Sequence, residues 1–169
     1  MLGRKKRRSE AGARGQSSDT YAGLRGMALD AVGRGLEPPS PEHPDVSGLV
    51  VDVPAQGGYA TVVALTDDTT SMYTSTGGGT IGAGSHAEVA AATQQLLAEV
   101  QRNLGRITAK DDHELPPAGF VRFHVLAPSS GRYADVPENA FWGREPHELM
   151  PVIASTQNVI SAIRAASPQ

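Results

Sequence analysis

The stretch from Ser71 to Gly105 constrains the fold of this chain most, because it joins three kinds of local structure in one run. It begins with a strand-like segment rich in Thr and Ser, passes through five glycines between residues 77 and 84, and enters a long segment rich in alanine and leucine. Apolar residues in that last segment recur at spacings of three and four, so they share one helical face: Val89, Ala92, Leu96, Leu97, Val100 and Leu104. The spacing predicts a helix over residues 86–104 with this face in the core.

The residues at both ends of this helix indicate how it begins and stops. Ser85 and Glu88 have the spacing of a capping box, in which each side chain accepts a hydrogen bond from the backbone N–H of the other residue. Gly105 suits the left-handed backbone position that often follows a helix. We therefore expect a capped helix that starts directly after the glycine loop.

The glycine loop is the first candidate binding site. Glycine lets the backbone approach a ligand closely, and free N–H groups at a helix start attract anions. The Gly82-Ala83-Gly84-Ser85 run resembles the Gly-Ser loops of small-molecule kinases of the GHMP type, which implies a phosphorylated ligand. The lysine of a P-loop is absent, and no Lys or Arg occurs between Ser71 and Gln101. Two interpretations stay open: a site for a phosphate or carboxylate, or a flexible turn between strand and helix.

The candidate ligand-binding residues come from this loop and from a later strand. The loop contributes Gly77, Gly78, Gly79, Gly82, Gly84, Ser85 and His86. The later strand, residues 120–126, carries Arg122 and His124 on the side opposite to its apolar face. These two side chains could bind an anion, or they could form the solvent-facing side of a sheet.

Length and composition indicate one globular domain. The chain has 169 residues, which suffice for one hydrophobic core and are too few for two comfortable ones. Cysteine is absent, which excludes disulfides, thiolate catalysis and cysteine-ligated metal sites. We expect a single domain over residues 18–166, preceded by a disordered basic tail over residues 1–17.

The charge distribution limits the partners. Residues 4–8 carry five positive charges, and removing them from the net charge of −3 leaves −8 for the remainder. The tail could make weak contact with an anionic membrane surface. Nucleic acid is an unlikely partner, since the chain has no second basic patch. No apolar run approaches the length of about 20 residues that spans a bilayer, and no signal peptide is recognisable, so we expect a cytoplasmic protein.

The remaining segments predict an α+β fold. A helix capped by Ser18 or Asp19 is followed by a proline-rich connector over residues 36–44 and by strands over residues 46–53, 59–66 and 69–76. The strand over residues 59–66 is apolar on both sides, which places it in the middle of the sheet. The strand over residues 69–76 is polar and suits an edge or a pocket wall. After the central helix come the strand at residues 120–126, a further short strand near 132–136, and a last helix over 147–165. The spacing of its apolar residues predicts one buried stripe on this last helix: Leu149, Val152, Ile153, Thr156, Ile160 and Ile163. The expected architecture is an antiparallel sheet of four to five strands packed by about three helices.

Catalytic and metal sites are not expected. Ser85 and His86 are adjacent in sequence, so on a helix their side chains diverge by about 100° and cannot act as a catalytic pair. The acidic and imidazole side chains at residues 111–114 are consecutive on an open loop, a spacing that rarely converges on one ion. We predict no cofactor. The uncharged outer face of the last helix, at Ser155, Gln157, Asn158 and Ser161, instead suggests self-association into a dimer.

Two segments resemble conserved hypothetical proteins of high-GC Gram-positive bacteria, and the resemblance covers most of the chain after Ser18. These segments are His43-Pro-Asp-Val-Ser-Gly-Leu-Val-Val-Asp-Val53 and Thr74-Ser-Thr-Gly-Gly-Gly-Thr-Ile-Gly-Ala-Gly84. The resemblance implies no particular activity. The order of elements is broadly similar to roadblock and profilin-like folds, which implies an adaptor or dimeric module rather than an enzyme. We therefore expect a non-catalytic binding, scaffold or regulatory module that binds a protein partner or itself. The alternative is a small enzyme or sensor that binds a phosphorylated ligand at the Gly77–Ser85 loop.

Overall fold

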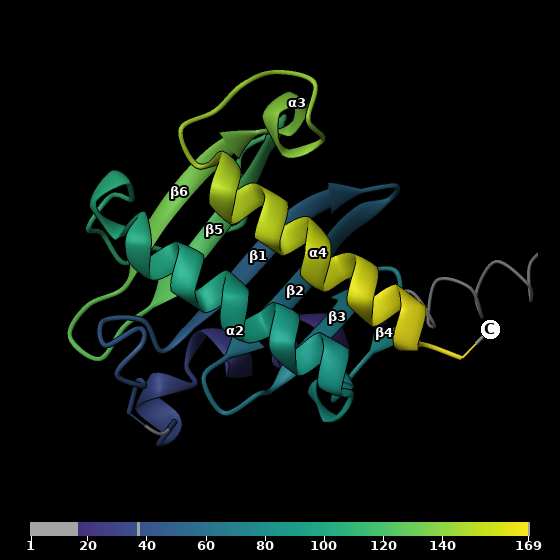
Figure 1. The fold of residues 1–169 in the computed structure, drawn as a ribbon. Helices are drawn as coiled ribbons and strands as arrows, with labels where there is room; N and C mark the ends of the chain where they lie inside the picture. Colours follow the sequence, from purple (N-terminus) through teal and green to yellow (C-terminus); the bar gives the residue numbers. More distant parts are fainter. Residues whose placement is uncertain (1–16, 37, 169) are drawn as a thin grey trace, which may run out of the picture.

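Six antiparallel strands form one sheet with helices on both of its faces (Figure 1). The computed structural model describes residues 17–36 and 38–168. The strand order across the sheet is β4-β3-β2-β1-β5-β6. The strand bounds are β1 Gly48–Ala55, β2 Gly58–Leu65, β3 Thr70–Thr74, β4 Gly79–Thr80, β5 Phe120–Leu126 and β6 Arg132–Pro137. The predicted α+β class is confirmed, with six strands where four to five were expected.

The two long helices lie side by side on one face of the sheet and run antiparallel (Figure 1). They are α2, Ala87–Arg102, and α4, Met150–Ala166, and the short helix α3, Glu138–Phe141, precedes α4. The N-terminal helix, residues 17–29, covers the opposite face and is drawn in purple behind the sheet in Figure 1. Single 3-10 turns occur at Val32–Arg34, Ala83–Ser85 and Leu104–Arg106.

The alternation of side chains along each strand produces two hydrophobic clusters. On β1, Leu49, Val51 and Val53 face α2 and α4, whereas Val50 faces the N-terminal helix. The same alternation on β2 buries side chains on both faces, as the sequence predicted for a central strand. The larger cluster lies under α2 and α4, and the smaller one lies under the N-terminal helix.

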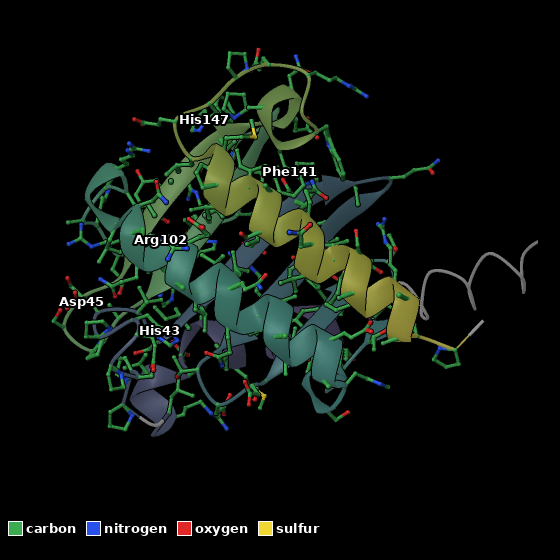
Figure 2. All side chains as sticks on the ribbon, viewed as in Figure 1. His43, Asp45, Arg102, Phe141 and His147 are labelled. Atoms are coloured by element: carbon green, nitrogen blue, oxygen red, sulfur yellow. The ribbon has the colours of Figure 1, made fainter. Side chains whose placement is uncertain are left out.

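Aromatic residues close the larger cluster near the start of α4. Phe141 is fully buried, and its ring centroid lies 6.1 Å from that of Phe123 and 4.9 Å from that of Trp142. Figure 2 shows Phe141 beside the first turns of α4 and His147 just before that helix. The Leu149 N–H donates to His147 Nδ1 at 3.1 Å, which satisfies one of the free N–H groups at the helix start.

The segment before β1 is attached to α2 by polar contacts from His43 to Gln94 and from Asp45 to Gln101. The buried His43 ring lies 3.1 Å from Gln94 Oε1 and 3.3 Å from the Val46 carbonyl oxygen. The Asp45 N–H donates to Gln101 Oε1 at 2.9 Å. Figure 2 shows His43 and Asp45 beside α2, with Arg102 at the end of that helix. The connector therefore has no regular structure of its own, as its prolines predict, yet it is held in place by side chains.

The predicted capping box is wrong. The residue before α2 is His86, with extended backbone and no side-chain cap, because the 3-10 turn at Ala83–Ser85 intervenes between the glycines and the helix. Ser85 Oγ donates instead to the Gly82 carbonyl oxygen at 3.2 Å. The sequence spacing of Ser85 and Glu88 is correct for a capping box, but Ser85 lies one residue before the N-cap position, which His86 occupies.

Other predicted helix ends also differ from the structure. Gly105 lies within the 3-10 turn Leu104–Arg106 and is not left-handed, since this turn extends the chain after α2. Residue 17 is already helical, so neither Ser18 nor Asp19 is the residue before the N-terminal helix. The basic tail predicted for residues 1–17 lies outside the described residues except for Ser17.

β3 is not the edge strand, because β4 pairs with its outer side.

The buried stripe predicted for the last helix is confirmed, and its outer face is partly engaged. Asn158 and Ser161 are exposed, whereas Gln157 Nε2 donates to the Phe141 carbonyl oxygen at 3.0 Å. Self-association through this face stays a prediction that native mass measurement can test. Within the described residues, no helix has both the length and the apolar character needed to cross a membrane.

Candidate functional site

A row of polar side chains crosses the sheet beneath the N-terminal helix. The strand register aligns one side chain from each of β3, β2, β1, β5 and β6 in this row: Tyr73, Thr61, Asp52, Arg122 and Asp135. Gly79 of β4, which has no side chain, lies at the end of the row beside Tyr73. All these positions share one face because side chains alternate along each strand. The row has two halves of different chemistry: ion pairs over β1, β5 and β6, and an uncharged groove over β3 and β4.

Asp52 is the centre of the charged half. Its side chain is fully buried and accepts hydrogen bonds from Arg25 Nη2 at 2.8 Å and from Thr61 Oγ1 at 2.7 Å. His124 Nε2 lies 2.8 Å from the same carboxylate, and Tyr21 Oη lies 2.8 Å from Thr61 Oγ1. Because Thr61 gives its proton to Asp52, the Tyr21 hydroxyl donates to Thr61. The network thus ties the N-terminal helix, through Tyr21 and Arg25, to the sheet.

Arg122 extends the charged half toward the edge at β6. Its guanidinium donates to both carboxylate oxygens of Asp135, at 2.7 and 2.9 Å, and lies 3.2 Å from Asp112 Oδ1. The guanidinium carbon also lies 4.6 Å from the centroid of the Tyr133 ring. The main-chain oxygen of Asp112 also lies 2.9 Å from His124 Nδ1. These contacts hold the loop at residues 111–114 over the sheet.

The uncharged half of the row forms a groove between the N-terminal helix and the β3–β4 edge. It consists of two hollows of about 490 and 210 Å³ that share Leu24, Tyr73 and Ile81. The first is also lined by Ser17, Thr20, Tyr21, Thr74, Gly77, Gly78 and Gly79, and the second by Met27, Ala28, Val63, Leu65, Thr69 and Ser71. We call the two hollows together the helix–strand groove. In the described part of the chain, no charged side chain lines it.

Tyr73 separates the two hollows and has an unusual hydroxyl group. The side chain is 6% exposed and packs edge-on against the Tyr21 ring, with centroids 5.9 Å apart. Its Oη is inaccessible to solvent and has no hydrogen-bond partner among the described residues. Burial is the main reason why the pKa of Tyr73 is raised above its usual value, so the hydroxyl stays protonated. The Tyr73 side chain therefore carries a hydrogen-bond donor that no described residue uses, and this donor is buried beside the groove.

The glycines of the predicted loop fall into two groups. Gly77, Gly78 and Gly79 have positive φ angles of 102°, 94° and 142° and form the turn that lines the groove. Gly84 lies outside the groove and packs so closely on the Asp68 carbonyl oxygen that a Cβ atom would collide with it. Gly82 also lies outside it, and its N–H donates to Ser71 Oγ at 3.2 Å.

The other predicted site residues are not brought to the glycine turn. Ser85 and His86 lie in the segment that leads into α2. Arg122 and His124 lie in the charged half of the row and are only 7% and 2% exposed, so the interpretation of their strand face as solvent-facing is wrong. Both are paired with carboxylates of this chain. Within residues 17–36 and 38–168, no three metal-ligating side chains lie close enough together to hold an ion.

Sequence reasoning missed the residues that organise this face. Asp52 interrupts the apolar run of β1, and a lone acidic residue in such a strand signals a buried partner. Tyr73 carries no comparable signal, because tyrosine is a common strand residue. The role of residues 17–28 as one wall of the groove is visible only after the helix is placed on the sheet.

Asp52 makes the stability of the fold sensitive to acid. Burial raises the pKa of this carboxyl, but hydrogen bonds from His124 and Arg25 and their positive charges outweigh burial, so the net pKa is lowered. A lowered folded-state pKa stabilises the fold above the unfolded pKa of about 3.9, and this contribution is lost as the pH falls through the folded-state value. We expect the free energy of unfolding to fall more steeply in the wild type than in Asp52→Asn as the pH is lowered from 5 to 3. Urea titrations at several pH values in this range measure it. Equal slopes would show that Asp52 does not govern acid stability.

Comparison with known proteins adds no family assignment. No protein family matches the sequence, and neither the curated proteins nor the solved structures include a significant match.

Proposed function

We propose that this protein is a non-catalytic binding module whose binding site is the helix–strand groove. One observation carries this proposal: the glycine turn and the hydroxyl-rich strand β3 meet the N-terminal helix around hollows that no described charged side chain lines. General acid–base chemistry needs a titratable group within reach of the ligand. Among the described residues, the only titratable side chains on the groove walls are the tyrosines Tyr21 and Tyr73, and burial raises the pKa of both.

The charged half of the row supports the same proposal. Asp52, Arg25 and His124 satisfy one another, and none of them lines the groove. Their arrangement supports a structural role, which is to hold the N-terminal helix as the groove wall. A protein partner, a second copy of this chain or a small ligand could then use the groove.

A thermal-shift screen tests this proposal. The screen would compare uncharged and phosphorylated small molecules on the wild type and on Ile81→Asp, which places a charge at the exposed rim of the groove. A ligand at about a hundred times its Kd stabilises by about 2.7 kcal/mol, which raises Tm by about 5 to 10 °C in a domain of this size. We expect stabilising compounds to lose their effect in Ile81→Asp, and NMR spectra to show that they are recovered unchanged.

Leu115→Asp is the matched control, because Leu115 is also an exposed aliphatic side chain and lines neither hollow. This variant should keep every wild-type shift. Conversion of a hit compound would contradict the non-catalytic assignment. Stabilisation by phosphorylated compounds alone would favour a phosphate site at the glycine turn instead.

A further inference from the structure

We infer that the helix–strand groove binds a small uncharged molecule with an apolar body and one hydrogen-bond acceptor, and that the Tyr73 hydroxyl is the donor. This inference rests on the proposed function, because it identifies the class of ligand for the same groove.

The groove walls favour an apolar body. Six of the side chains that line it are aliphatic or methionine: Leu24, Met27, Ala28, Val63, Leu65 and Ile81. Met27 and Ile81 are 51% and 67% exposed, and both lie at this groove. A ligand that covers them removes apolar surface from water, which is favourable. The larger hollow, about 490 Å³, has the size of a small-molecule site.

The Tyr73 hydroxyl requires an acceptor. Buried polar groups in folded proteins nearly always have a hydrogen-bond partner, so an isolated donor between two hollows needs an explanation. Tyr21, on the facing helix, has already given its own hydroxyl proton to Thr61. A carbonyl, ether or hydroxyl oxygen of a ligand would complete the hydrogen bonding of Tyr73 once the ring shifts to admit it.

The ligand should carry no charge. An ion buried in this groove would lose its hydration without gaining a counter-ion from the described walls. Arg25, which follows the groove residue Leu24 in the N-terminal helix, is already paired with Asp52 at 2.8 Å. Uncharged acceptors such as ketones or amides are therefore favoured over carboxylates and phosphates.

Three small probes of similar shape test the ligand class on the full chain. They are acetophenone, which has an acceptor, ethylbenzene, which has none, and benzoate, which is charged. Binding is followed by titration of the backbone amide signals of ¹⁵N-labelled protein, in the wild type and in Tyr73→Phe. We expect acetophenone to shift the signals of Leu24, Gly78 and Ile81 in the wild type, and to bind about five- to tenfold more weakly to Tyr73→Phe. Ethylbenzene should bind both proteins equally, and benzoate should bind neither.

Two further measurements separate binding from folding effects. Tyr73→Phe removes an unpaired buried hydroxyl, so the ligand-free variant should unfold at the wild-type temperature or above it. Tyr133→Phe is the matched control, since Tyr133 lies on β6 at the far end of the sheet and should leave acetophenone affinity unchanged.

The outcomes distinguish this inference from the proposed function. Acetophenone that binds in the groove equally well with and without the Tyr73 hydroxyl overturns the inference and leaves the groove as the site. Tighter binding of benzoate than of acetophenone also overturns the inference and leaves the groove as the site. The same conclusion follows if no probe shifts the groove signals while the screened compounds still lose their effect in Ile81→Asp. If the probes and the screened compounds bind only outside the groove, both the inference and the proposed function are overturned.

Discussion

Replacing Asp52 by alanine is expected to lower the free energy of unfolding by about 3 to 5 kcal/mol, the loss typical of removing one partner of a buried ion pair. The variant leaves the Arg25 guanidinium and the His124 Nε2 atom without the fully buried carboxylate that each of them contacts at 2.8 Å. It also leaves Thr61 Oγ1 without its acceptor. The cost is therefore that of several groups losing their partner at once.

Urea denaturation followed by circular dichroism measures this loss. Asp30→Ala serves as the control, because Asp30 is an exposed aspartate just after the N-terminal helix, and its loss should change stability by less than about 0.5 kcal/mol. A double-mutant cycle with Arg25→Leu should show that the two substitutions together cost less than their sum. Additive losses would indicate that the two groups do not stabilise each other.

The same substitution should disturb the helix–strand groove. Arg25 and Tyr21 belong to the network, and Tyr21, Leu24 and Met27 on the same helix line the groove. Residues spaced by three or four share a helix side, so these two sets lie close together on one rigid element. Loosening the network therefore moves a groove wall without touching the groove itself.

Phe141→Ala is expected to cost about 3 to 5 kcal/mol, the usual loss when a buried phenyl ring is truncated. Phe141 is 1% exposed and projects from the end of α3 into the larger hydrophobic cluster, against Phe123 and Trp142. Removal leaves a cavity that the surrounding strands and helices fill only in part. The expected result is a large fall in the midpoint of urea unfolding with an unchanged m-value.

Trp142→Ala is the matched control for this cavity. Trp142 is the next residue and has a larger ring, but it is 47% exposed, so its removal leaves no closed cavity. The loss should be less than half of that for Phe141. A greater loss for Trp142 would place the main aromatic contact of this region at the surface instead of in the core.

The repeating patterns of the chain were enough to predict the elements and their buried faces. The apolar spacing of α4 predicted its buried stripe, and the β2 sequence predicted a strand covered on both sides. These predictions succeed because period 2 and period 3.6 are local properties of the backbone. The capping box failed because a 3-10 turn displaced the helix start, and nothing in the local spacing of Ser85 and Glu88 reports that turn.

The groove and the buried network were decided by tertiary structure. Arg25 meets Asp52 across 27 positions of sequence, and His124 meets it across 72. Composition and periodicity report which side chains are polar, but not which strand register will align them in one row. The glycine turn illustrates the same limit: the sequence by itself determined that residues 77–79 can take left-handed conformations, whereas the N-terminal helix, placed opposite them by long-range contacts, decided that they line a groove.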